Sequence, residues 1–182
     1  MFEKAFNGEL IEGRTQTYTL EDVSPEVFRL VQQWLYFQKL TLSVHDEDKP
    51  DNPAEKGHKS KCSHQDMVLV KLWVFAQKFC MDRLQNAVID HMVRIQRKCG
   101  RMNPRCFEYI YKNTADGSPL RHLAVDQVAW SAPSFLANQE DRPHEMLLEL
   151  VFLFAEQLPQ SVRKRKNAEM TAEDYHVTED YS

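Results

Sequence analysis

The stretch MVLVKLWVFAQKF, at Met67–Phe79, carries apolar side chains at most of its positions. A helix that is apolar almost all round needs protein on every side, so this stretch predicts a helix in the middle of a domain. The following stretch has apolar residues at helical spacing, which predicts a second helix. These residues are Leu84, Val88, Ile89, Met92 and Ile95. The two helices should form a hairpin that turns near Cys80–Asp82.

Upstream of this hairpin, Ser24, Pro25 and Glu26 form a strong helix start. Serine caps the first turn, proline suits the first helical position, and an acidic side chain suits the positive end of the helix dipole. The helix should run to about Gln38. Its expected apolar stripe consists of Phe28, Val31 and Leu35, with Val27 and Trp34 beside it.

Two short segments are predicted as strands, the first because it is rich in β-branched and aromatic residues and follows Gly13. They are Thr15–Leu20 and Leu40–Ser43. Between the second of these and the central helix, residues 44–66 are polar and contain two prolines, so we expect a long flexible loop there.

Downstream, residues 100–103 break the chain, and Asn103-Pro104 and Ser118-Pro119 each start another helix. A last helix should span roughly Pro143–Leu158, because Pro159 ends it. Residues 160–182 are expected to be a disordered tail, since they contain few apolar side chains.

The residues on both sides of the polar gap resemble the BTB/POZ domain, and most closely the large set of fungal BTB proteins. The resemblance covers about Phe2–Ile95. Its most specific pieces are SPEVF at Ser24–Phe28, WLY at Trp34–Tyr36 and AQKF at Ala76–Phe79. The residues after Cys99 are similar to the helices that follow the domain in those proteins.

The resemblance implies an α+β, mostly helical fold with one or two short strands and a C-terminal helical extension. It divides the chain into a partial BTB/POZ-like domain at 1–98, an extension at 99–159 and the tail. It also implies a module that binds other proteins, with a cullin of a ubiquitin ligase or another BTB protein as the expected partner.

A complete BTB domain has two strands and a helix ahead of the part that matches Phe2–Gly8. The family's dimer interface uses that helix, so the resemblance does not extend to standard homodimerisation. The alternative function is therefore a truncated BTB fragment that is inactive or depends on a partner for its missing strands.

The sequence favours recognition over catalysis. It contains no GxSxG, GxxxxGK[ST] or HExxH motif, and we interpret Glu145 and Glu149 as surface carboxylates. A net charge of −4 disfavours direct nucleic-acid binding. The basic run Arg163–Lys166 suits either a nuclear localisation signal or the negative end of a preceding helix, and we prefer the second interpretation. The longest apolar run is too short for a membrane span. The four cysteines are irregularly spaced and we see no secretion signal, so we expect reduced thiols in a cytoplasmic or nuclear protein.

Three residues in the polar segment have the side chains that zinc prefers, namely His58, Cys62 and His64. A structural site needs four ligands, and His45 is the nearest further candidate. The spacing matches no standard zinc finger, so we interpret them as loop residues and expect no metal or other cofactor. Cys99 and Cys106 are expected to pack or to have no role.

Phe37 is the one candidate site residue. It lies opposite the expected apolar stripe of its helix and next to the polar segment, where an exposed aromatic ring can anchor a partner. The competing interpretation is that the helix frays first and the ring folds inward.

Overall fold

A computed structural model of the chain describes Arg14, Leu20 and residues 23–45, 57–99, 102–130 and 142–161. Every regular element in these ranges is an α-helix. The helices are α3 (Pro25–Phe37), α4 (His58–Lys78), α5 (Asp82–Cys99), α6 (Arg105–Asn113), α7 (Pro119–Ala129) and α8 (His144–Gln157).

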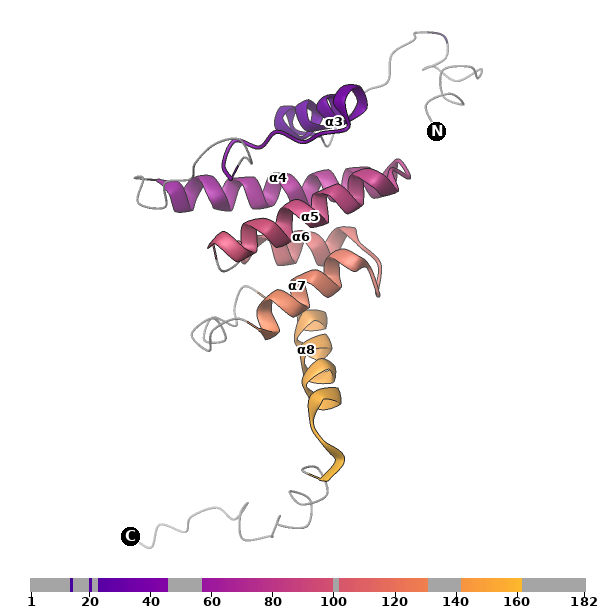
Figure 1. Cartoon of the computed structure of the whole chain (residues 1–182). Coiled ribbons are helices and arrows are strands. Elements are labelled where there is room, and N and C mark those ends of the chain that lie inside the picture. Colours follow the sequence, from indigo (N-terminus) through magenta and orange to yellow (C-terminus); the bar gives the residue numbers. More distant parts are fainter. Residues whose placement is uncertain are drawn as a thin grey trace, which may run out of the picture.

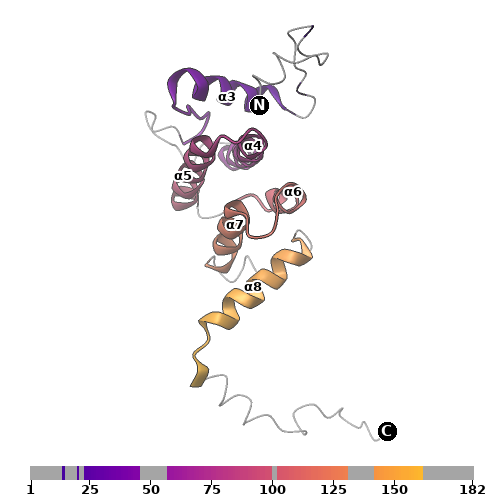
Figure 2. The same ribbon diagram turned by 90° about the vertical axis from the view of Figure 1, so that its right-hand side faces the viewer.

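The helices form a stack in chain order, from α3 at one end to α8 at the other (Figure 1). The long helix α4 is at its centre and packs against α3, α5 and α6, while α7 joins α6 to α8. Helix α8 packs on α7 and then projects obliquely away from the stack (Figure 2). The helical extension therefore shares its core with the α4–α5 hairpin.

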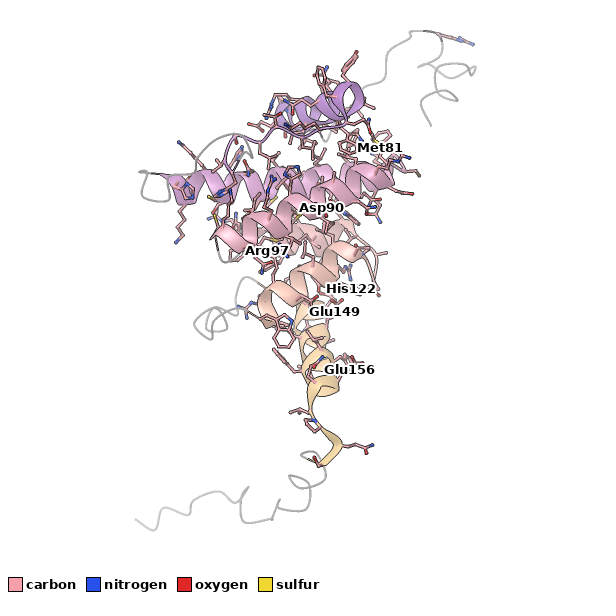
Figure 3. The ribbon with its side chains drawn as sticks, in the orientation of Figure 1. Met81, Asp90, Arg97, His122, Glu149 and Glu156 are labelled. Carbon is pink, nitrogen blue, oxygen red and sulfur yellow. The ribbon has the colours of Figure 1, made fainter. Side chains whose placement is uncertain are left out.

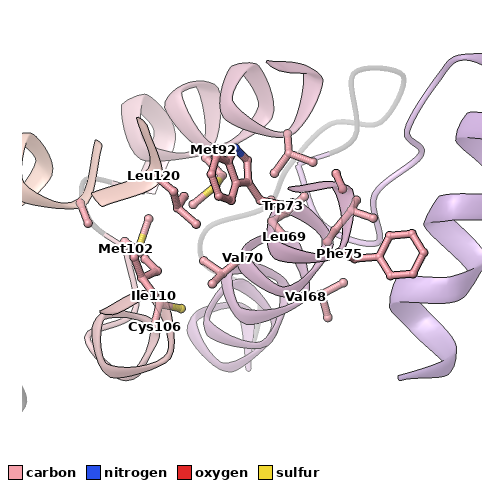
Figure 4. Close-up of a cluster of buried hydrophobic side chains, with 14 of the residues drawn as sticks. Val68, Leu69, Val70, Trp73, Phe75, Met92, Met102, Cys106, Ile110 and Leu120 are labelled. Carbon is pink, nitrogen blue, oxygen red and sulfur yellow. The ribbon is translucent and has the colours of Figure 1, made fainter. Parts of the chain in front are cut away.

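The core confirms that the Met67–Phe79 stretch is the central buried helix. Leu69, Val70 and Leu72 are fully buried, and Trp73 is 2% exposed. In Figure 4, Val70 points toward the α6 residue Ile110, whereas Phe75 points to the opposite side, toward α3. Helix α4 is apolar on several faces because it has neighbours on several sides.

The expected α+β fold is wrong for the described residues, none of which belongs to a strand. Leu40 and Leu42 are both 4% exposed and alternate with exposed residues, which imitates a half-buried strand. The backbone N–H of Thr41 instead donates to Gln33 Oε1 (3.1 Å), and that of Val44 donates to Gln65 Oε1 (2.7 Å). Side chains of neighbouring helices thus satisfy the backbone donors that a sheet would use. Of the other predicted strand, only Leu20 is described, and it is not in a strand.

The expected loop at 44–66 is also partly wrong, because α4 begins at His58. Tertiary contacts stabilise this polar start of the helix. Gln65 is buried and accepts from Val44, and Asp66 is buried and accepts from the Asn103 backbone N–H (2.9 Å). Residues 46–56 lie outside the described residues.

Helix α3 begins as predicted, with Ser24 Oγ accepting from the Val27 N–H (3.4 Å). Its orientation differs from the prediction, because Val27, Leu30 and Val31 form the buried face. Phe28 and Leu35 are 42% and 59% exposed. The predicted stripe was wrong, because α3 has two apolar faces and only packing decides which of them faces α4.

Candidate functional site

Four side chains with metal-binding atoms meet where the start of α4 faces the end of α5. His45 lies in the coil after α3, His58 and Cys62 lie one turn apart on α4, and Cys99 is the last residue of α5. Their ligand atoms all lie within 4.8 Å of one another. The spacing i, i+4 places His58 and Cys62 on one side of α4, and the hairpin returns Cys99 to that side.

The distances within this cluster are short. The Sγ atoms of Cys62 and Cys99 are 3.7 Å apart, and His45 Nε2 lies 3.1 Å from Cys62 Sγ and 2.9 Å from Cys99 Sγ. The rings of His45 and His58 meet edge to face, with centroids 5.1 Å apart. Two sulfurs bound to one tetrahedral zinc are about 3.7 Å apart, and a sulfur and a nitrogen about 3.6 Å apart. The sulfur pair has this spacing, and His45 is about half an ångström too close.

The cluster is largely removed from water. His45 is 2% exposed and Cys62 is 8% exposed, while His58 and Cys99 are half-buried. His45 also has a φ of 60°, in the left-handed region that residues other than glycine seldom adopt. The surrounding packing therefore holds this imidazole against the two sulfurs despite a local backbone cost.

The remaining candidate ligands lie elsewhere. His64 Nε2 is 3.5 Å from Glu26 Oε1 at the surface, so it does not join His58 and Cys62. Cys106 is fully buried in the core, where burial raises the pKa of its thiol, and Cys80 is exposed at the α4–α5 turn.

Sequence reasoning missed Cys99, although the predicted hairpin carried a signal for it. Cys62 lies 19 residues before Met81, and Cys99 lies 18 residues after it. Residues at similar distances from the turn of a helical hairpin come side by side in the antiparallel pair. Neither the local spacing of the ligands nor a zinc-finger pattern predicts that Cys62 and Cys99 lie close together.

Phe37 lies in a surface that we call the α3 face. Phe37 is 75% exposed, Tyr36 is 80% exposed, and their ring centroids are 6.3 Å apart. Helix α3 runs through Phe37, and Gln38 ends it in the left-handed conformation. The interpretation that Phe37 is exposed is confirmed, and the alternative that its ring folds inward is wrong.

A second apolar surface, the α8 face, lies on the helix that projects from the stack. Met146 and Leu150 pack inward, whereas the opposite side of α8 is exposed. The exposed residues are Leu148 (47%), Val151 (63%), Phe152 (67%) and, at the end of the helix, Leu158 (50%). Trp130, at the end of α7, is 65% exposed, and its ring lies edge to face with that of Phe154.

A groove of about 440 Å³ follows the junction of α7 and α8 beside this surface. Its apolar walls come from Val125, Phe152 and Leu153. Carboxylates of both helices surround these walls, among them Asp126, Glu149 and Glu156. Figure 3 labels Glu149 and Glu156 along α8, below His122 of α7.

The carboxylates of Glu145 and Glu149 both lie near the Tyr111 hydroxyl and make different contacts. Glu149 Oε2 accepts from the Tyr111 hydroxyl (2.7 Å), which links α8 to α6. Burial and this hydrogen bond raise the pKa of Tyr111. Glu145 lies beside a groove that Tyr111, Arg105, Lys112 and Arg142 also line, and its charge also raises the pKa of Tyr111. The basic run Arg163–Lys166 lies outside the described residues.

No protein-family model, curated protein or solved structure matches this chain. None of the described helices is both long and apolar enough to cross a membrane.

Proposed function

We propose that this chain is a protein-interaction module, related to the helical part of BTB/POZ domains, and that it acts by recognition rather than catalysis. The observation that supports this most is the α8 face. Helix α8 has apolar side chains on two opposite sides, and only the side with Met146 and Leu150 is covered. A contiguous exposed apolar surface of this kind is typical of a binding site.

The charges around the α8 face favour a particular class of partner. The apolar strip lies beside the exposed carboxylates of Asp126 and Glu156, so the best occupant is an amphipathic protein helix with basic side chains along the edge that faces them. The same carboxylates would repel an anionic membrane surface or a nucleic acid. The exposed rings of Tyr36 and Phe37 offer a second contact for the same partner or for another one.

The exposed area is sufficient for a moderate affinity. Covering a half-exposed Leu, Val or Phe side chain contributes roughly 1 kcal/mol, and the α8 face has four such residues beside Trp130. Association and side-chain ordering offset part of this gain. The partner helix would bury a similar apolar area of its own, and the combined gain, less these costs, corresponds to a dissociation constant of about micromolar order.

The resemblance suggests a cullin as the partner, which gives the first experiment. Light scattering on a sizing column would give the mass of the full chain alone and mixed with the amino-terminal domain of a cullin. The adaptor role requires a discrete complex that gains one cullin per protomer. Phe152→Asp should abolish that complex, whereas Asp90→Ala, an exposed change on α5, should leave it intact.

A folded chain that elutes alone and ignores the cullin would contradict the adaptor role. A complex that forms equally well with Phe152→Asp would contradict the role of the α8 face. Circular dichroism of each variant would confirm that its helices are intact.

A further inference from the structure

We propose that His45, His58, Cys62 and Cys99 together bind one structural zinc ion. Two thiolates and two imidazoles are a standard ligand set for zinc, and four protein ligands close the coordination sphere. A closed site has no open position for water or a substrate. The ion would therefore hold segments of the fold together rather than catalyse a reaction.

The charges of this site balance when the ion is bound. Binding releases one proton from each of the two thiols, and the resulting two negative charges neutralise Zn²⁺. A neutral centre can stay buried, as the low exposure of His45 and Cys62 requires.

A bound ion would also account for two local features. Helix α4 starts with the polar residues His58–Lys61 after Gly57, and within the described residues no side chain caps it. His45 holds a positive φ that coil residues usually avoid. Ligation would stabilise both, because it fixes His58 in the first turn of α4 and holds His45 against the two sulfurs.

A disulfide between Cys62 and Cys99 is the competing chemistry. It would require the two sulfurs to approach from 3.7 Å to about 2.05 Å. It would also leave unexplained why two imidazoles converge on the same point. Zinc ligation would involve all four side chains, and the two sulfurs already have the separation that it requires.

The test uses the full chain, reduced, stripped with a chelator and titrated separately with Zn²⁺ and Co²⁺. We expect one equivalent of zinc. Cobalt should give the intense visible absorption of a tetrahedral complex and a thiolate-to-metal band in the near ultraviolet. Zinc should also slow the reaction of two of the four cysteines with a thiol reagent.

Matched variants assign the ligands. His58→Gln and Cys99→Ser should weaken zinc binding at least tenfold and change the cobalt spectrum. His64→Gln, also on α4, and Cys80→Ser, at the exposed turn, should change neither. His58 and Cys99 are both only half-buried, so both variants should stay folded, and either one alone tests the ligand set.

The proposal is overturned if the stripped chain takes up no stoichiometric zinc, or if His58→Gln binds zinc as tightly as the unchanged chain does. It is also overturned if the chain purified under mild reduction contains a Cys62–Cys99 disulfide and does not bind zinc. None of these readouts involves a partner protein, so they are independent of the proposed function.

Discussion

Three residues other than glycine have a positive φ in the described part of the chain, and their surroundings differ. Gln38 ends α3 and donates to the Trp34 carbonyl from both its backbone N–H (2.9 Å) and its side-chain Nε2 (2.8 Å). His45 belongs to the proposed zinc site. Cys80 lies at the exposed turn between α4 and α5, with its backbone N–H bonded to the Gln77 carbonyl. The backbone N–H of the following Met81 bonds to the Ala76 carbonyl (2.8 Å), so Cys80 occupies the left-handed position that glycine usually takes at the end of a helix.

Cys80→Gly should stabilise the fold. An L-residue in the left-handed region costs about 1–2 kcal/mol, and glycine avoids this cost but has greater freedom in the unfolded chain. We expect a net gain of roughly 0.5–1 kcal/mol, measured as a higher urea midpoint. Cys80→Ala keeps the Cβ atom and should change the midpoint little. If alanine stabilises as much as glycine does, the backbone explanation fails.

Asp66 makes stability depend on pH. Burial raises its pKa from 3.8 to about 6, although the Asn103 N–H bond and the charge of His45 oppose the shift. The folded chain therefore binds more protons than the unfolded chain between about pH 4 and pH 6. Its free energy of unfolding should fall as the pH rises through this window, by at most about 3 kcal/mol.

Asp66→Asn tests this dependence, since an amide oxygen can still accept from the Asn103 N–H. The variant should show a flatter pH profile between pH 4 and pH 6 and be the more stable chain at pH 7. Urea titrations in the presence of a chelator would separate this effect from metal binding. If the free energy of unfolding depends on pH equally in the unchanged chain and in Asp66→Asn, another group titrates between pH 4 and pH 6.

At the scale of helices, the sequence predicts the end of a helix well where a proline, serine or turn residue marks that end. Pro104 precedes α6, Pro119 is the first residue of α7 and α5 begins at Asp82 after the predicted turn, but the Ser118 side chain makes no capping hydrogen bond. Helix α4 begins nine residues before the predicted apolar stretch, because the contacts of Gln65 and Asp66 are tertiary. The apparent strand Leu40–Ser43 fails for the same reason.

For the candidate sites too, local sequence predicts some features, whereas tertiary packing decides the others. The exposure of Phe37 follows from its place at the end of α3, so the sequence could indicate it. The zinc ligands come from a coil and two helices, so their meeting depends on the register of the hairpin. His64 has a suitable residue type and spacing, but packing turns it toward Glu26 instead.

Arg121 stabilises the turn between α6 and α7. Its side chain is 7% exposed, donates to Thr114 Oγ1 (3.1 Å) and to the Tyr111 carbonyl (2.9 Å), pairs with Asp116, and stacks 4.4 Å from the Tyr111 ring. Arg121→Met would leave buried carbonyls without their donor and should cost roughly 2–4 kcal/mol. Arg83→Met, at an exposed site on α5, should cost less than about 0.5 kcal/mol. Equal losses in denaturant midpoint would refute this role of Arg121.

At the scale of the whole molecule, the stack leaves one side of its last helix uncovered, and this asymmetry can be measured. Leu150→Ala removes a side chain that is 5% exposed and should cost about 2–4 kcal/mol. Phe152→Ala removes a larger side chain that is 67% exposed and should change the free energy of unfolding by less than about 1 kcal/mol. A large loss for Phe152→Ala would mean that the α8 face is covered within the chain itself.

The proposed zinc site would also couple stability to metal concentration across the whole molecule. The ion would join the coil after α3, the start of α4 and the end of α5, so unfolding would disperse its ligands. Above the dissociation constant, each tenfold rise in free zinc should then add about 1.4 kcal/mol to the free energy of unfolding. Urea unfolding in zinc buffers measures this slope. The full slope in Cys80→Ser, and a slope that begins only at zinc concentrations at least tenfold higher in His58→Gln, would confirm that the linkage arises at this cluster. A flat response in the unchanged chain would mean that zinc does not bind the folded state in preference to the unfolded one.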